Sequence, residues 1–162
     1  MFELNGIFFA MLGAAIASGL AGTGSAKGCG VAGEAAAGVI AEDPSKFGLT
    51  LLLQALPGTQ GIYGTLMAFL VLNKIGAISG NFVNIDAVTG MLIMFSCIPV
   101  GLVGWTSGYA QGKTCAAGIC MIAKRPEEIA KGMVYGAMVE TYAILALLVS
   151  ILSIFGIVNV PF

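Results

Sequence analysis

The sequence contains no histidine and little charge of either sign. Among its 162 residues, 7 are Lys or Arg and 8 are Asp or Glu, so the formal net charge is −1. Charged residues make up 9% of the chain, whereas about 25% is usual for a soluble domain. This charge balance argues against nucleic-acid binding, and the lack of imidazole removes the commonest metal ligand and acid–base group.

The cysteines do not form a CxxC pair. The four are Cys29, Cys97, Cys115 and Cys120, and they have no histidine companions. We interpret them as small apolar packing residues.

Long apolar stretches account for most of the chain, of which 58% is hydrophobic. They run over residues 6–40, 47–73, 87–122 and 129–158, and polar or glycine-rich joints separate them. Each exceeds the roughly 20 residues that a helix needs to cross a bilayer, and helices are the default structure for such runs. We therefore predict an all-α membrane protein with four transmembrane helices.

The basic residues indicate an orientation in the membrane. Six of the seven lie toward the first and third joints, and only Lys74 lies on the other side. The six are Lys27, Lys46, Lys113, Lys124, Arg125 and Lys131. The positive-inside rule then predicts that the loops near 41–47 and 123–131 are cytoplasmic and that both termini are outside.

The two halves of the chain repeat. Gly-Ser-Ala-Lys-Gly at 24–28 corresponds to Gly-Tyr-Ala-Gln-Gly at 108–112, and each half has a proline in its loop, Pro44 and Pro126. We predict duplicated helical hairpins in residues 1–80 and 81–162. Counted from the loop prolines, Gly58 is the counterpart of Glu140, so only the second hairpin carries a carboxylate at that level.

Glycines recur at four-residue spacing in the first and third stretches, a spacing that lets helix backbones touch. They are Gly24, Gly28, Gly104, Gly108 and Gly112. Two interpretations remain open from these residues alone: close packing within one bundle, or helices that line the inside of a ring of identical copies.

Glu140 is the only charged side chain from residue 132 to the end of the sequence. A carboxylate at the bilayer centre costs about 2.5–3.5 kcal/mol on insertion scales, so such a residue is a functional hypothesis by default. The remaining membrane-depth polar residues can therefore be tested as its partners.

Helix geometry places these residues at one level. Gln111 lies 15 residues before Pro126 and Glu140 lies 14 after it, so both sit about 21–22 Å from the turn at 1.5 Å per residue. Thr59 and Gln60 lie 15 and 16 residues after Pro44, at nearly the same height. We expect the four side chains to converge from three helices.

Pro57 should loosen the helix nearby and release a backbone carbonyl that another group must satisfy. Together with the four side chains, this carbonyl would make an all-oxygen shell suited to a hard cation, and the single carboxylate balances a monovalent one. The alternative is that the polar side chains only form hydrogen bonds with a protonated Glu140.

Two other features have simpler explanations. Residues 108–114 look like a phosphate-binding loop but have three residues between the glycines where four are required, and they lie within a membrane helix, so we reject that function. Glu34 lies seven residues after Lys27, and we expect it to be solvated or paired with Lys27 rather than to form a second ion site.

The chain resembles the membrane-ring proteolipid of V-type and A-type rotary ATPases along nearly its whole length. The most specific motifs are Leu-Pro-Gly-Thr-Gln-Gly-Ile-Tyr-Gly at 56–64, Ala-Gln-Gly-Lys at 110–113 and Met-Val-Glu-Thr-Tyr-Ala at 138–143, and they are similar to the bacterial sodium-pumping subunit K. The resemblance implies that the carbonyl of Leu56 and the side chains of Thr59, Gln60, Gln111 and Glu140 bind Na⁺. It also implies that Tyr63 closes the site by a hydrogen bond to the carboxylate.

The resemblance further implies a homo-oligomeric ring that carries Na⁺, or alternatively H⁺, across a membrane. The expected partners are identical copies, a stator membrane subunit with an arginine, a central-stalk subunit at the cytoplasmic loops, and lipid. The chain itself would not be an enzyme, and the host membrane would be a bacterial cell membrane. A self-contained secondary Na⁺/H⁺ carrier and a purely structural proteolipid are the remaining alternatives.

Overall fold

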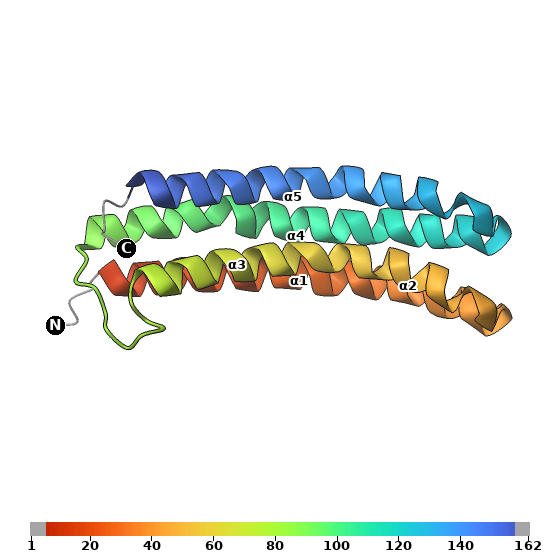
Figure 1. Ribbon diagram of the computed structural model, residues 1–162, viewed down its shortest axis with the longest axis horizontal. Coiled ribbons are helices and arrows are strands. Elements are labelled where there is room, and N and C mark those ends of the chain that lie inside the picture. Colours follow the sequence, from red (N-terminus) through yellow and green to blue (C-terminus); the bar gives the residue numbers. More distant parts are fainter. Residues whose placement is uncertain (1–5, 158–162) are drawn as a thin grey trace.

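The chain has four long helical segments. They lie side by side in a curved rod (Figure 1). The structure is a computed structural model, and it describes residues 6–157. The first hairpin consists of α1 (Gly6–Glu42) and a second segment that contains η1 (Pro44–Lys46), α2 (Phe47–Ala55), η2 (Leu56–Gly58) and α3 (Thr59–Lys74). The second hairpin consists of α4 (Ala87–Lys124), η3 (Pro126–Glu128) and α5 (Ile129–Ile157). No strand occurs within residues 6–157.

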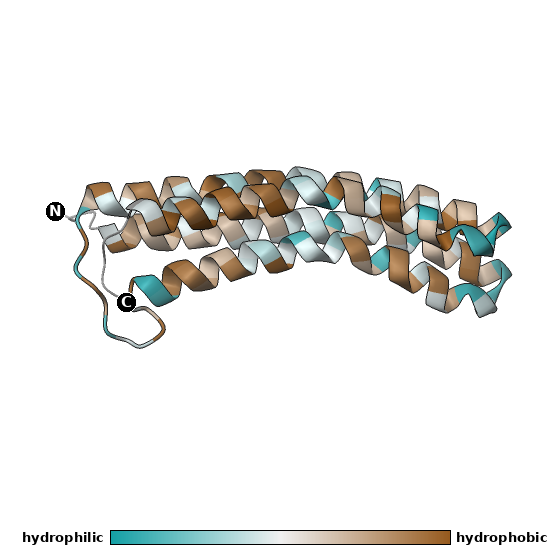
Figure 2. Ribbon diagram, turned by 45° about the horizontal axis from the view of Figure 1, so that its top comes forward, coloured by the Kyte–Doolittle hydropathy of each residue, from teal (hydrophilic) through white to brown (hydrophobic). Residues whose placement is uncertain are grey.

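The expected all-helical fold with four membrane-spanning segments is confirmed. The spans Gly6–Glu42, Pro44–Lys74, Ala87–Lys124 and Pro126–Gly156 are each long and apolar enough to cross a membrane. Figure 2 shows hydrophobic residues along the rod and a concentration of hydrophilic ones at the end with the short η1 and η3 turns. Residue 158, at the end of the last predicted stretch, lies outside the described residues, as do residues 1–5 and 159–162 of the two predicted hairpins.

The turns η1 and η3 lie together at one end of the rod (Figure 1). Asp43 caps η1 by accepting hydrogen bonds from the Ser45 hydroxyl at 2.6 Å and the Ser45 N–H at 3.1 Å. The Ser45 hydroxyl is the main reason that the pKa of Asp43 lies below its ordinary value. Lys46 pairs with Asp43 at 3.3 Å and donates to the Ala123 carbonyl at 2.7 Å, so this lysine connects η1 to the end of α4.

The connection between the hairpins runs from residue 75 to residue 86 at the other end of the rod. Gly76 has a φ of +76°, a conformation that glycine adopts without steric cost, and the Val83 N–H returns to the Ile75 carbonyl at 3.1 Å. Asp86 then caps α4 by accepting from the N–H groups of Val88 and Thr89. The proposed division between residues 80 and 81 lies inside this connection.

Helices α1 and α4 touch backbone to backbone along their glycines. A Cβ atom on Gly24 would lie 2.5 Å from the Gly104 carbonyl oxygen, and one on Gly108 would lie 2.8 Å from the Gly24 carbonyl carbon. These glycines therefore pack within one chain, which is the first of the two interpretations above. That the same helices also line a ring stays a prediction.

Two apolar clusters fill the interior and leave a polar layer between them. The cluster nearer the 75–86 connection includes Met67, Val71, Ile75, Ile93, Val100 and Ile154, and the cluster nearer the turns includes Leu53, Ile119 and Ile122. Cys97 is buried in the first cluster and Cys115 in the second, as expected of packing residues, whereas Cys120 is exposed. Gln60 and Gln111, both 0% exposed, lie in the layer between the clusters.

Candidate ion-binding site

The break at η2 brings the first two predicted ligands together. Pro57 lies inside this 3₁₀ turn, and because it has no N–H it cannot continue the hydrogen-bond ladder of α2. The Leu56 carbonyl oxygen accepts the backbone N–H of Thr59 and also its hydroxyl, at 3.0 Å. The carbonyl and the hydroxyl thus lie next to each other at the start of α3.

A pair of fully buried amides connects the two hairpins. Gln60 Nε2 on α3 donates to Gln111 Oε1 on α4 at 2.6 Å, and the Thr59 hydroxyl lies 3.5 Å from Gln60 Oε1. Unpaired amide groups are costly in a membrane interior, so this hydrogen bond fixes the level at which the hairpins meet.

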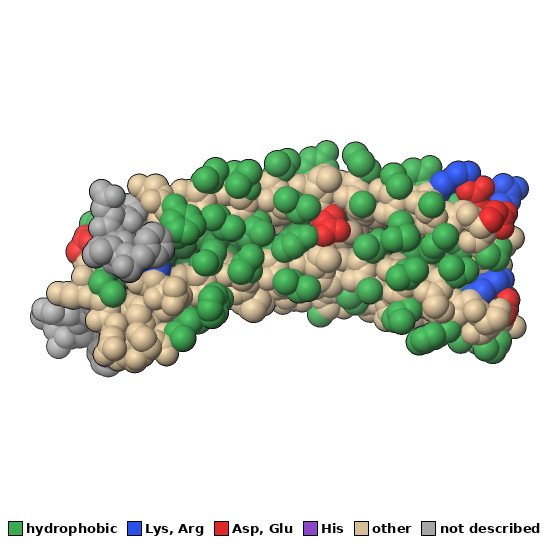
Figure 3. Space-filling view, in the orientation of Figure 1, with side chains coloured by type: hydrophobic (Ala, Val, Ile, Leu, Met, Phe, Trp, Pro, Cys, Tyr) green, Lys and Arg blue, Asp and Glu red, His purple; other side chains and the backbone are tan. Residues whose placement is uncertain are grey.

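Glu140 on α5 receives a donor on each carboxylate oxygen. The Tyr63 hydroxyl donates to Oε1 at 2.5 Å, and Gln111 Nε2 donates to Oε2 at 3.3 Å. Glu140 and Tyr63 are both only partly buried, so the carboxylate lies at the edge of the bundle rather than at its centre. In Figure 3 an acidic group lies at mid-length among hydrophobic side chains, far from the charges gathered at the end with the turns.

The structure therefore brings together every residue that the sequence singled out for the site. Leu56, Thr59, Gln60, Gln111, Glu140 and Tyr63 form one hydrogen-bonded chain that spans η2, α3, α4 and α5. The convergence that was expected from counting residues to the turns is present.

Gly136 belongs to the same cluster, although the sequence did not predict it there. Its carbonyl oxygen accepts a hydrogen bond from Gln111 Nε2 at 3.0 Å. A Cβ atom on Gly136 would lie 3.1 Å from Leu56 Cδ1 and 3.1 Å from Cys115 Sγ, so glycine leaves room for the neighbouring side chains. The available signal was its position one helical turn before Glu140, on the same face.

Within the described residues, the hydrogen-bond partners of the Glu140 carboxyl are neutral. Within the part of the chain that the structure describes, the ion pairs are Lys46–Asp43 and Lys131–Glu128, both near the turns. The same residues contain no cluster of three His, Cys, Asp or Glu that could hold a metal. The oxygens of one carboxylate, two amides, a hydroxyl and a carbonyl suit a hard monovalent cation instead, and a protonated acid could donate its O–H to the Tyr63 hydroxyl oxygen.

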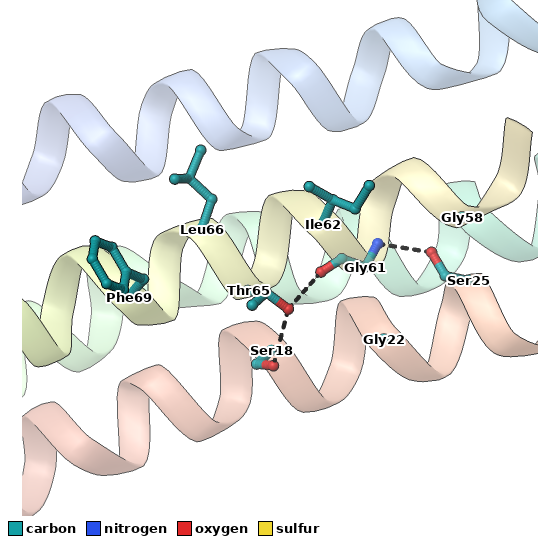
Figure 4. A pocket seen from close by; sticks show the side chains of 9 residues that line it. All are labelled: Ser18, Gly22, Ser25, Gly58, Gly61, Ile62, Thr65, Leu66 and Phe69. Atoms are coloured by element: carbon teal, nitrogen blue, oxygen red, sulfur yellow. Dashed lines mark hydrogen bonds between the residues drawn. The ribbon is translucent and has the colours of Figure 1, made fainter.

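One groove on the chain lies away from Glu140 and has no ionisable side chain in its lining. It encloses about 660 Å³ between α1 and α3 and includes Gly58, the counterpart of Glu140 in the first hairpin. Figure 4 shows its hydroxyl groups already engaged, with Thr65 donating to the Gly61 carbonyl at 2.9 Å and Ser25 accepting from the Gly61 N–H at 2.7 Å. The first hairpin therefore presents no carboxylate to this groove.

Of the two alternatives expected for Glu34, solvation or pairing with Lys27, the structure does not show the pairing. Glu34 is exposed, and the Lys27 ammonium lies 6.0 Å from the centre of the Trp105 ring instead. The solvated alternative for Glu34 remains consistent with this geometry.

Comparison with known proteins shows to which family the chain belongs. The model of the family that is described as the C subunit of ATP synthase matches the chain twice, over residues 12–71 and 88–153. The chain is 46% identical over 150 residues to the V-type sodium ATPase subunit K of Enterococcus hirae, with 93% of this chain and 92% of that protein covered. It is 40% identical over 146 residues to the A-type ATP synthase subunit K of Methanocaldococcus jannaschii, with 90% of this chain and 61% of that longer protein covered. The two matched segments correspond to the two hairpins and include every residue of the polar layer. The chain therefore belongs to the family of the ATP synthase C subunit.

Proposed function

We propose that this chain is an ion-translocating rotor subunit of a V/A-type rotary ATPase, and that it carries Na⁺ across the membrane. The observation that carries the proposal is a lone carboxylate at membrane depth, Glu140, in an oxygen-rich cluster shared by three membrane-spanning segments. The name of the Enterococcus hirae relative, a sodium ATPase subunit K, supports Na⁺ as the ion.

The proposed ligands are the Leu56 carbonyl and the side chains of Thr59, Gln60, Gln111 and Glu140. Their spacing along η2, α3, α4 and α5 supports this assignment because they already contact one another through hydrogen bonds. Tyr63 would act as a lock, since its hydroxyl holds the outer side of the carboxylate. With a cation bound, the negative charge is neutralised and its exposure to lipid becomes less costly.

The proposed mechanism is rotation of a ring of identical copies. Each copy would carry its neutralised site through the lipid until a stator subunit's arginine displaces the ion into a half-channel. This chain performs no bond chemistry in that cycle, and ATP hydrolysis or synthesis takes place in other subunits. A central-stalk subunit would bind at the η1 and η3 turns, where most of the chain's charged side chains lie.

The chain is an integral multi-pass membrane protein, and we further propose that it sits in a bacterial cell membrane. The turns near 41–47 and 123–131 would be cytoplasmic and both termini outside. The turns η1 and η3 lie at the same end of the rod, so both must face the same side of the membrane, which supports that arrangement (Figure 1).

A proton is the second candidate for the ion. One contact of Glu140 is compatible with it, because the Tyr63 hydroxyl oxygen, 2.5 Å from Oε1, could accept the O–H of a protonated carboxyl. A proton-carrying rotor would use the same carboxylate and the same ring.

Sodium content measured on purified, sodium-equilibrated protein tests the proposal. We expect about one tightly held Na⁺ per chain, loss of this ion in Glu140→Gln, and retention in the matched control Glu34→Gln, which removes an exposed carboxylate outside the cluster. Retention of bound sodium by the Glu140→Gln variant would show that Glu140 does not bind the ion. Absence of sodium from the wild type, together with an intact ring, would favour the proton.

A further inference from the structure

Two exposed charges of opposite sign, Glu34 on α1 and Lys113 on α4, lie inside membrane-spanning helices. Glu34 is 10 residues before Pro44, and Lys113 is 13 residues before Pro126. At 1.5 Å per residue, their Cα atoms lie about 15 and 20 Å from the turns. The ion pairs of the described residues are both near the turns and include neither side chain. Charges at membrane depth are costly and usually pair with one another, so each of these lacks a partner that it needs.

Within one chain the two charges lie on opposite flanks of the α1–α4 pair. Gly28 of α1 packs against Gly108 of α4, and this contact fixes the facing sides of the two helices. At 3.6 residues per turn, Glu34 lies about 120° around α1 from Gly28, and Lys113 lies about 140° around α4 from Gly108. Both side chains therefore point away from the contact between the hairpins. Their partners must come from outside the chain.

A backbone contact between the hairpins shows how such flanks can meet. Gly28 contacts Gly112, and neither position has room for a side chain. Val31 lies three residues after Gly28, and Ala116 lies four residues after Gly112, so each lies beside this contact on its own helix. Val31 and Ala116 are both partly buried.

The repeat of the two hairpins transfers this contact to the free flanks. Counted from the loop prolines, the counterpart of Val31 in the second hairpin is Lys113. By the same count, the counterpart of Ala116 in the first hairpin is Glu34. If the second hairpin of one copy packs against the first hairpin of the next copy as the two hairpins pack within the chain, the two charges come together.

The free flanks have the small residues that such close packing requires. The counterpart of Gly28 is Ala110, and the counterpart of Gly112 is Gly30. Ala110 and Gly30 are exposed, and a Cβ atom on Gly30 would meet nothing within 4 Å in its own chain. A helix of a second copy can therefore approach α1 closely at Gly30, which lies one turn before Glu34.

We propose that Lys113 of one copy forms an ion pair with Glu34 of the next copy, across a contact between α4 and the neighbouring α1. Their heights differ by about 5 Å, which the long, flexible stem of a lysine can span. The pair would remove two unpaired charges from the membrane interior and fix the vertical register between copies. This inference rests on the proposed ring of identical copies, but not on the identity of the ion that the ring carries.

Lys27 is the other basic residue near this depth. It is 17 residues before Pro44, so its Cα lies about 25 Å from the turns and about 10 Å from the height of Glu34. Its ammonium group lies 6.0 Å from the centre of the Trp105 ring of the same chain. Lys113 is therefore the better placed partner for Glu34 of a neighbouring copy.

Charge reversal tests the pair in the whole protein. Lys113→Glu and Glu34→Lys each place like charges side by side, so we expect each to lower the yield of ring about tenfold by native mass spectrometry in mild detergent. A chain with both substitutions restores opposite charges and should recover the ring. Lys124→Glu, which reverses an exposed charge at the turns, is the matched control and should assemble like the wild type.

Co-expression shows whether the pair joins different copies. Chains with Lys113→Glu and differently tagged chains with Glu34→Lys are complementary only to each other, so we expect mixed rings that contain both tags. Recovery in the doubly substituted chain without mixed rings would place the pair inside one chain and overturn the proposal. Recovery of the ring by Lys27→Glu in the Glu34→Lys chain would overturn it in favour of Lys27.

Wild-type ring yields from both single variants would also overturn the pair while leaving the rotor in place. Absence of a ring from the wild type would instead overturn the proposed function, and the pair with it. Bound sodium per chain should be the same in all these variants, because the cluster around Glu140 lies within a single chain.

Discussion

At the scale of single residues, the two oxygens of Glu140 are held unequally. The Tyr63 hydroxyl approaches Oε1 to 2.5 Å, whereas the Gln111 amide is 3.3 Å from Oε2 and also donates to the Gly136 carbonyl. The shorter contact comes from the outer edge of the cluster and the longer one from its buried interior. Tyr63 is therefore placed to control access to the carboxylate from the edge of the bundle. Gln111 is placed to hold the carboxylate in position from the interior.

Tyr63→Phe isolates the contribution of the hydroxyl. The ring stays, and the carboxylate loses one hydrogen bond, which is worth about 0.5–1.5 kcal/mol for a neutral pair and more for a charged acceptor. We expect release of bound ²²Na⁺ to become several-fold faster with assembly intact. Tyr135→Phe is the control, because Tyr135 is 60% exposed and lies outside the cluster. Identical release rates for Tyr63→Phe and the wild type would remove Tyr63 from the site.

Much of the site could be predicted because a helix converts residue number into height. Counting from Pro44 and Pro126 was enough to expect Thr59, Gln60, Gln111 and Glu140 at one level, and the structure brings them together. The contact between Tyr63 and Glu140 was predicted from the family resemblance alone. Gly136 escaped prediction because its contribution is a backbone carbonyl, and such groups leave no side-chain signal in a sequence.

At the scale of elements, the glycines of α1 and α4 determine how closely the two hairpins approach. Four-residue spacing predicted a close contact, but it could not tell whether the partner helix belonged to the same chain. The structure places Gly108 against Gly24 of the same chain, with the backbone atoms of Gly24 and Ser25 nearest to any added Cβ. A substitution there must therefore disturb the subunit itself before it disturbs any assembly.

Gly108→Ala tests this packing against Gly38→Ala. A Cβ on Gly108 would lie 2.8 Å from the Gly24 carbonyl carbon, whereas one on Gly38 would meet nothing within 4 Å. We expect Gly108→Ala to cost about 1–3 kcal/mol through overpacking, and Gly38→Ala to be neutral or to stabilise its helix slightly. Thermal unfolding in detergent, followed by circular dichroism, gives the comparison. Equal unfolding temperatures for the two variants would show that the α1–α4 contact can relax at no cost.

The second membrane segment shows a limit of prediction at this scale. Pro57 indicated a loosened helix, but not its extent, because a proline can kink, break or merely tighten a helix. The structure has a single 3₁₀ turn, Leu56–Gly58, after which α3 resumes directly at Thr59. Hydrogen bonds from the N–H and hydroxyl of Thr59 to the Leu56 carbonyl stabilise this short interruption.

For the molecule as a whole, the important feature is one carboxylate at the level of the polar layer for four membrane-spanning helices. The duplication supplies two similar hairpins, but the position that corresponds to Glu140 is Gly58, whose groove contains no ionisable side chain. Each chain should therefore carry one ion per passage. A rotor built from such chains would move fewer ions per turn than one with a carboxylate on every hairpin.

Carbodiimide labelling tests both the number of sites and the identity of the ion. The reagent attacks a protonated carboxyl, and a proton and Na⁺ compete for the same carboxylate, so labelling should quicken as pH falls and slow as sodium is added. We expect one modified residue per chain, at Glu140, with Glu34 and the acidic residues at the turns largely unmodified. Gln111→Ala and Thr59→Ala should each weaken sodium protection, because they remove proposed ligands while the carboxyl remains available.

Potassium at the same concentration is the control for ionic strength. Protection by potassium equal to that by sodium would overturn the sodium assignment. A pH response with no sodium protection would leave the rotor in place but make the proton its ion, since the carboxylate would still load and unload once per turn.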